Sequence, residues 1–120
     1  MPQQAIEFSN NAAGAQTVGV GKRIFIIPRG KWRLRDVRAR LNTAPAGSTF
    51  LIDVNKNGTT VFPTQADRTT IQAGANDSDT HRTQANAIYS GGDRLSYDVD
   101  QIGSGTAGSD LDTTFYLERA

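Results

Sequence analysis

Hydrophobic and polar residues alternate with a period of two in several short segments of the chain, and turns rich in glycine or proline separate these segments. The clearest case is 93–103, where Leu95, Tyr97 and Val99 alternate with polar residues. The C-terminal segment 111–119 repeats the pattern. A period of two is that of strands with one buried face, so both segments are predicted to be β-strands.

Three other segments are predicted to be strands. Residues 23–28 form a short, continuous apolar run rich in β-branched residues, which indicates a buried strand rather than a helix. Residues 5–8 are predicted to form the first strand, followed by a polar connector. Residues 70–74 are predicted to form a further short strand, and the polar, patternless stretch 75–86 is predicted to be a long loop that is mobile or contacts partners.

The segment 31–41 fits either a helix or a strand. Val37 and Leu41 have helical spacing, but apolar residues also alternate with arginines along the segment, with one change of phase. No residue suited to cap a helix precedes the segment. We therefore predict a strand, and the change of phase requires a bulge near Arg35 or Asp36.

The stretch 50–62, "FLIDVNKNGTTVF", has the Asp and Asn spacing of a calcium-binding loop that would begin at Asp53. Such a loop needs a carboxylate at its twelfth position and a helix on either side. The twelfth position is Thr64, and Pro63 precedes it. We therefore predict no metal site, and we expect Asp53 to be a solvated strand residue.

The same stretch fits a β-hairpin. Asn55, Asn57 and Gly58 suit a type I turn followed by a bulge, in which Asn55 is the first corner and Gly58 takes the left-handed conformation. This turn would place Ile52 opposite Phe62 and would turn both side chains toward the core.

Seven to eight short strands in a chain of 120 residues predict one all-β domain. The predicted architecture is a single antiparallel β-sandwich of jelly-roll type. We assign residues 23–120 to the sandwich. Residues 1–22 are expected to form an N-terminal arm together with the first strand or strands, and this arm could contact partners.

Charge adds one feature to this picture. The formal net charge is +1, but eight Lys or Arg residues lie between Lys22 and Arg40 against the single acid Asp36. Arginines at alternate strand positions are typical of a solvated sheet face. The alternative is a surface that docks on an acidic partner or on the acidic face of an identical subunit. The candidate interaction residues are Lys31, Trp32, Arg33, Arg35, Arg38 and Arg40.

Nucleic-acid binding is not expected, because Trp32 is the one aromatic residue among the closely spaced basic residues of 31–40, and single-strand binders stack bases on several interleaved aromatic residues. Catalysis is not expected either. The chain has no cysteine and one histidine, His81, in a polar loop. Asp98 and Asp100 would lie on one strand face as its solvated half. We predict no catalytic residue, no metal ligand and no cofactor. The N-terminus does not resemble a secretory signal, and no apolar run is long enough to span a bilayer.

Taken together, the later segments resemble a β-sandwich module that recurs in structural proteins of tailed bacteriophages, both in capsid decoration (cement) proteins and in head or tail fibres. The resemblance runs from Val37 to the C-terminus. It rests on the order and spacing of "APAG" (44–47), "DVNKNGTTVF" (53–62), "IQAG" (71–74), "GDRLSYDVDQIGS" (92–104) and "AGSDL" (107–111).

The resemblance implies a virion protein without enzymatic activity. We expect a decoration protein, made in the host cytoplasm, that binds the major capsid protein on the capsid surface and forms a homotrimer. The alternative is a carbohydrate- or receptor-binding module of a phage fibre or baseplate. In that case an aromatic-lined face or the loops would bind sugars, and the aromatic candidates are Trp32, Tyr89, Tyr97 and Tyr116.

Overall fold

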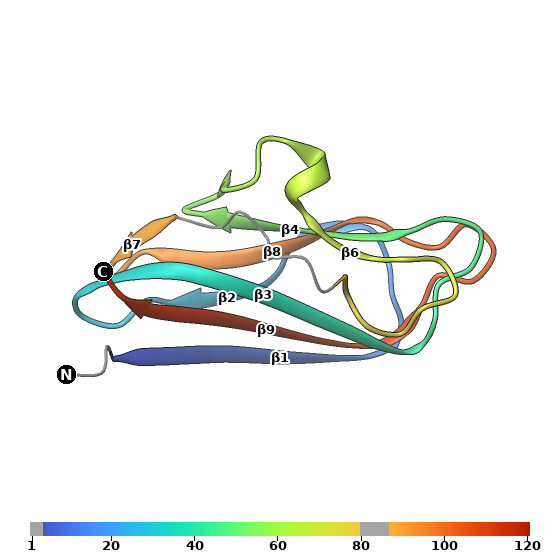
Figure 1. The fold of residues 1–120 in the computed structure, drawn as a ribbon, viewed down its shortest axis with the longest axis horizontal. Helices are drawn as coiled ribbons and strands as arrows, with labels where there is room; N and C mark the ends of the chain where they lie inside the picture. Colours follow the sequence, from blue (N-terminus) through green and yellow to red (C-terminus); the bar gives the residue numbers. More distant parts are fainter. Residues whose placement is uncertain (1–3, 80–86) are drawn as a thin grey trace.

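A computed structural model describes residues 4–79 and 87–120, and these residues form two antiparallel sheets packed face to face (Figure 1). The strands are β1 (Ala5–Ala15), β2 (Gly19–Ile26), β3 (Lys31–Thr43), β4 (Phe50–Lys56), β5 (Thr59–Thr60), β6 (Thr69–Ile71), β7 (Ile88–Ser90), β8 (Arg94–Gln101) and β9 (Ser109–Arg119). One short 3-10 helix, η1 (Gln65–Asp67), lies between β5 and β6.

The first sheet, which we name sheet A, has the order β1-β9-β3-β7, and the second, sheet B, has the order β2-β8-β4-β5. Strand β6 also pairs with β4, on the same side as β5. Strands β5 and β6 therefore together take the place of a single edge strand beside β4. Counted as one strand, they give eight strands in the order of a jelly roll, in which the chain passes repeatedly from one sheet to the other. The predicted all-β sandwich is therefore confirmed.

The space between the sheets is filled by the residues that alternation places on one side of each strand. Phe25 of β2 stacks on Phe8 of β1 with ring centroids 5.0 Å apart, and it meets the edge of Phe115 of β9 at 5.7 Å. These contacts join the two sheets at their β1–β2 side. The buried core also includes Leu34, Val37, Leu41, Phe50, Ile52, Val54, Phe62, Ile71, Leu95, Tyr97, Val99, Leu111 and Leu117.

The ambiguous segment 31–41 is a strand, as predicted. Its register against β9 shifts between Leu34 and Asp36, so one extra residue bulges from the ladder. The bulge changes the phase of the alternation, and Leu34 and Val37 both face the core. The bulge predicted near Arg35 or Asp36 is confirmed.

The N-terminal segment differs from the expected arm. The described part of 1–22 is built into the sandwich, because β1 runs to Ala15 and pairs with β9 from Ala5↔Glu118 onward. The polar stretch after Phe8 was expected to be a connector. It is strand instead, because β9 offers it a full backbone ladder, and such a ladder overrides the weak strand propensity of Asn and Ala.

The predicted hairpin register is wrong. Asn55 pairs with Thr60, and the loop contains two residues, Asn57 and Gly58, with φ of 51° and 85°. Two left-handed central residues make a type I′ turn, whose twist matches that of the flanking strands better than a type I turn does. Asn55 is consequently a buried strand residue and not a turn corner.

The shift in register changes the partners of the two apolar residues that the prediction had paired. Ile52 pairs with Thr69 of β6 on one side and Val99 of β8 on the other. Phe62 follows β5 and is buried in the core without a sheet partner among the described strands. The prediction that both side chains face the core is confirmed.

Three loops that lie far apart in the sequence pack together at one end of the sandwich, at the right of Figure 1. The Ala46 N–H donates to the carbonyl of Thr106 at 2.9 Å, and the Gly74 N–H donates to the carbonyl of Pro45 at 2.7 Å. A Cβ at Gly103 would lie 1.9 Å from the Thr106 carbonyl oxygen. We name this set the loop cluster (44–49, 72–75 and 102–108). It leaves no room for a side chain at position 103.

The described helical residues are limited to η1, and no helix in 4–79 or 87–120 has the length and hydropathy needed to cross a bilayer.

Candidate functional site

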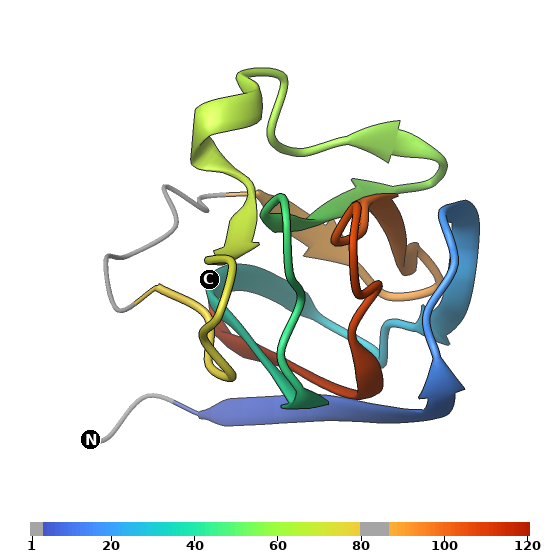
Figure 2. The same cartoon turned by 90° about the vertical axis from the view of Figure 1, so that its right-hand side faces the viewer.

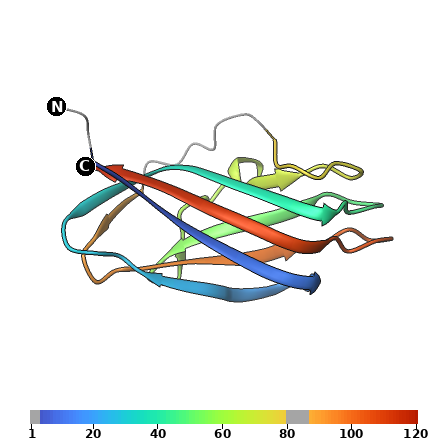
Figure 3. The same ribbon diagram turned by 90° about the horizontal axis from the view of Figure 1, so that it is seen from below.

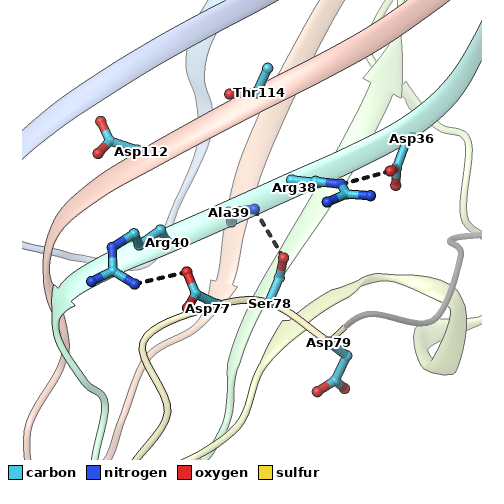
Figure 4. Close-up of a pocket in the computed structure, with 9 residues that line it drawn as sticks. All are labelled: Asp36, Arg38, Ala39, Arg40, Asp77, Ser78, Asp79, Asp112 and Thr114. Atoms are coloured by element: carbon cyan, nitrogen blue, oxygen red, sulfur yellow. Dashed lines mark hydrogen bonds and ion pairs between the residues drawn. The ribbon is translucent and has the colours of Figure 1, made fainter.

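A polar groove of about 390 Å³ lies on the outer face of sheet A, beside the segment that follows β6 (Figure 4). We name it the sheet A groove. It is lined by Asp36, Arg38, Ala39, Arg40, Asp77, Ser78, Asp79, Asp112 and Thr114. Its floor is formed by the outward residues of β3 and β9, and its wall by residues 77–79, which pack along the edge of β3.

Backbone bonds to β3 hold the wall in place. The Ser78 N–H donates to the carbonyl of Ala39 at 2.9 Å, and the Ala39 N–H donates to the Ser78 hydroxyl at 3.1 Å. The Leu41 N–H donates to the carbonyl of Asn76 at 2.8 Å. Residues 76–78 therefore continue sheet A for a short distance where β7 no longer covers β3.

The charged groups of the groove are largely paired with one another. Arg40 contacts Asp77 at 2.8 Å and Arg38 contacts Asp36 at 2.9 Å. The hydrogen bond to Asp36 raises the pKa of Arg38 above its ordinary value. Asp112 accepts a hydrogen bond from the side-chain amide of Asn11. The groove thus offers guanidinium, carboxylate and hydroxyl groups that can form hydrogen bonds with a polar ligand.

The predicted basic row on β3 is present, but acidic neighbours neutralise most of it. Arg35 contacts Glu118 at 3.2 Å, and Arg38 and Arg40 are paired within the groove. Lys31 is exposed and Arg33 is half-buried near the start of the strand. The outer face of sheet A therefore carries charges of both signs, because β9 and residues 76–79 place their acids beside the arginines.

Trp32 is not available to a partner. It is 2% exposed, lies between the sheets and is covered by the guanidinium of Arg119, whose central carbon is 5.2 Å from the ring centroid. Tyr89 and Tyr97 are also buried, and burial raises the pKa of Tyr89. Of the four aromatic residues proposed for sugar binding, only Tyr116 reaches the outer face of sheet A, where it is half-buried.

Tyr116 lines a second hollow of about 310 Å³ on the same face, together with residues 5–7, Arg35 and Glu118. It lies two positions along β9 from Thr114, which lines the sheet A groove. Successive outward residues of a strand lie on the same face, so Tyr116 stands between the two hollows.

The outer face of sheet B carries an acidic cluster that the sequence analysis expected to be solvated. One carboxylate oxygen of each of Asp53, Asp98 and Asp100 lies within 4.8 Å of the others. Asp53 is 4% exposed and Asp98 is 9% exposed, so neither is an ordinary surface acid. The expected exposure is wrong because the chain between β5 and β6, at the top of Figure 2, crosses over the outer face of β4.

Arg68 and backbone amides hold this cluster together. Arg68 contacts Asp100 at 3.0 Å and Asp53 at 3.4 Å. Asp53 also accepts from the Thr60 hydroxyl at 2.7 Å, and Asp98 accepts from the Gly21 N–H at 2.8 Å. Through these bonds the segment around η1 and the irregular part of β2 near Gly21 are held against the carboxylates and cover them.

Burial, and secondarily the charge of Asp53, raises the pKa of Asp100 above its ordinary value of 3.8. Arg68 opposes this effect without outweighing it.

His81 lies outside the described residues, so its predicted solvated position is not addressed. The sequence did not predict the sheet A groove. The alternation along β3 and β9 does predict which residues face outward and form the floor of the groove. The wall at 77–79 belongs to a stretch with no periodicity, and nothing in its sequence indicates that it would pair with β3.

No protein-family model matches the chain, and no curated protein sequence matches it. Among solved structures, the fold is similar to the native structure of a family 35 carbohydrate-binding module from Clostridium thermocellum. The two chains share 14% sequence identity, the match covers 97% of this chain and 92% of the other, and the TM-score is 0.45. A likeness of this degree does not bear on function.

Proposed function

We propose that the protein is a structural component of a tailed-bacteriophage virion, and specifically a decoration protein that binds the assembled capsid through the major capsid protein. The observation that carries the proposal is the position of the segments behind the resemblance. "APAG" (44–47), "IQAG" (71–74) and the glycine-rich link before β9 meet in the loop cluster. Segments that pack on one another form one structural unit, so the resemblance rests on more than unrelated turns.

The close packing of the loop cluster explains two glycines of these segments. A Cβ at Gly47 would lie 2.2 Å from the Ser104 hydroxyl, and a Cβ at Gly103 would lie 1.9 Å from the Thr106 carbonyl oxygen. The cluster accounts for the fold of the module. The predicted interaction residues Lys31 and Arg33 lie outside the loop cluster, at the start of β3, and we place the capsid contact there.

The test is binding to undecorated capsids of the parent phage. Purified protein is expected to co-sediment with these capsids and to raise their resistance to heating. The double substitution Lys31→Glu with Arg33→Glu is expected to weaken co-sedimentation, because no carboxylate of the described residues lies within 4.0 Å of either cation. Lys22→Glu, a charge reversal at a single cation on the other sheet, is the control. Wild-type protein that neither co-sediments nor stabilises capsids would refute the proposal.

Sugar binding is a second candidate, favoured by the position of Tyr116 between two hollows that both contain charged side chains. Aromatic rings stack on the apolar faces of sugars, and surrounding carboxylates and guanidiniums can bind their hydroxyls. On a glycan array, a ligand bound by the wild type should be lost with Tyr116→Ala and kept with Tyr116→Phe, which retains the ring. An array without hits, or equal binding by all three proteins, excludes this candidate.

A further inference from the structure

The exposed large apolar residues of the described chain all lie on β2 and its approach. The exposed fractions are 58% for Val18, 85% for Val20, 52% for Ile24 and 62% for Ile26. Residues 23–28 were predicted to form a buried strand, and this prediction is wrong for the side chains of Ile24 and Ile26. An apolar run predicts burial, but here the topology places the strand at the edge of a sheet, along the border of the sandwich in Figure 3.

Strand β2 has β8 as its one neighbour among the described strands, so its other side presents unpaired backbone groups. The N–H of Ile27 points to β8, where it donates to the carbonyl of Asp93 at 2.9 Å. Backbone direction alternates along a strand, so the N–H and C=O groups of Ile24 and Ile26 point away from the sheet.

The two halves of this edge differ. The register between β2 and β8 shifts between Gly19 and Arg23, and Gly21 has a φ of 58°. The bulge is fastened by the bond from the Gly21 N–H to Asp98. Bulges and lysines protect sheet edges from pairing, and Lys22 lies in this half. The half from Arg23 to Ile26 has a regular register and contains neither a bulge nor a lysine.

We propose that two copies of the chain associate through this regular half, with the β2 strands antiparallel about a two-fold axis at Phe25. Ile24 of each copy then lies opposite Ile26 of the other, and Phe25 faces Phe25. The outward backbone groups of Ile24 and Ile26 are in position to form hydrogen bonds in both pairs. Sheet B becomes continuous through both molecules.

A second copy suits this edge for two reasons. The apolar residues are self-complementary in this register, and no other described surface exposes large apolar side chains that a different contact between copies could use. The charges also agree. Arg23 lies opposite Ile27 of the other copy, which places it near Asp93 of that copy, and no like charges are directly opposed. A sheet edge accepts one strand, so this contact makes a pair in place of the expected trimer.

Measuring the molar mass of the purified chain in solution tests the contact without capsids, and therefore independently of the proposed function. Sedimentation over a concentration series should give twice the 12.9 kDa chain mass. Ile24→Lys with Ile26→Lys should give monomers, while Val20→Lys, the most exposed site but outside the paired half, should stay dimeric. Wild-type monomers at all concentrations, trimers, or equal disruption by Val20→Lys would overturn the proposal.

Cysteine cross-linking tests the register, since the natural chain contains no cysteine. A mixture of Ile24→Cys and Ile26→Cys chains should form a disulfide dimer, because opposed Cα atoms in a hydrogen-bonded pair are about 5.5 Å apart. Each variant alone should cross-link far less. Cross-linking by Ile24→Cys alone would contradict the axis at Phe25, because it would place Ile24 opposite itself.

Discussion

At the scale of single residues, the turn at Asn57 and Gly58 shows how backbone conformation selects side chains. Both residues have positive φ, and the Asn57 side chain also joins the turn to the start of β8: its carbonyl oxygen accepts from the Arg94 N–H at 2.9 Å. Asn suits this position because its short polar side chain tolerates the left-handed region and finds local partners. The hairpin is thereby connected to the neighbouring strand pair.

Replacing Gly58 by valine should destabilise the protein by about 1–2 kcal/mol, the approximate cost of a left-handed conformation for a residue with a Cβ. Apart from Gly58 and its two chain neighbours, no atom of the described residues lies within 4 Å of the added Cβ, so the loss would come from the backbone and not from a clash. Urea unfolding measures the difference. Thr59→Val, a β-branched change at the next, exposed position, is the control and should have little effect.

At the scale of elements, carboxylates fasten segments to sheets, and two of them respond to pH in opposite directions. Asp93 accepts from the Ser90 N–H at 2.8 Å and from the Asn57 side chain at 3.2 Å, and these bonds lower the pKa of Asp93 below 3.8. It connects the turn between β7 and β8 to the hairpin. Asp100, whose pKa is raised, fastens the segment around η1 to β8 through Arg68.

The sign of each effect follows from linkage. The stability that Asp93 contributes is present above its unfolded-state pKa and is lost as the pH falls through its lower native value. The difference in free energy of unfolding between the wild type and Asp93→Asn should therefore be largest near neutrality and shrink on acidification. For Asp100, the contribution is present below the unfolded-state pKa and is lost as the pH rises through the higher native value.

The free energy of unfolding of the wild type relative to Asp100→Asn should therefore rise on acidification. Over the same acidic range, the value relative to Asp93→Asn should fall. Urea unfolding of the three proteins at a series of pH values measures both trends. Parallel pH dependence in the two variants would contradict these assignments.

At the scale of the whole molecule, the sandwich divides its surfaces by role. The loop cluster closes one end of the sandwich and is too tightly packed to accept side chains at Gly47 and Gly103. The outer face of sheet A is polar and hollowed, which suits a polar or charged partner. The regular half of β2 is apolar and lies at a free sheet edge, which suits another strand. The capsid-binding and self-association proposals thus concern different surfaces and can be tested separately.

Periodicity by itself was enough to predict the all-β class, most strands, the inward residues of β8 and β9, and the bulge in β3. These features depend on the alternation of side chains along one strand, which is a local property of the chain. The glycine and asparagine of the hairpin likewise indicated a turn. The choice between two turn types changed the pairing by one residue, because both types accept this dipeptide and the neighbouring strands decide the register.

Tertiary structure alone decided which outward faces meet solvent. Asp53 and Asp98 have the pattern of solvated residues but are buried, because the chain around η1 and the bulge of β2 cover them. Ile24 and Ile26 have the pattern of buried residues but are exposed, because the topology places β2 at an edge. The alternation along a strand specifies which side chains share a face. What covers that face depends on segments far away in the sequence, and only the folded chain brings them together.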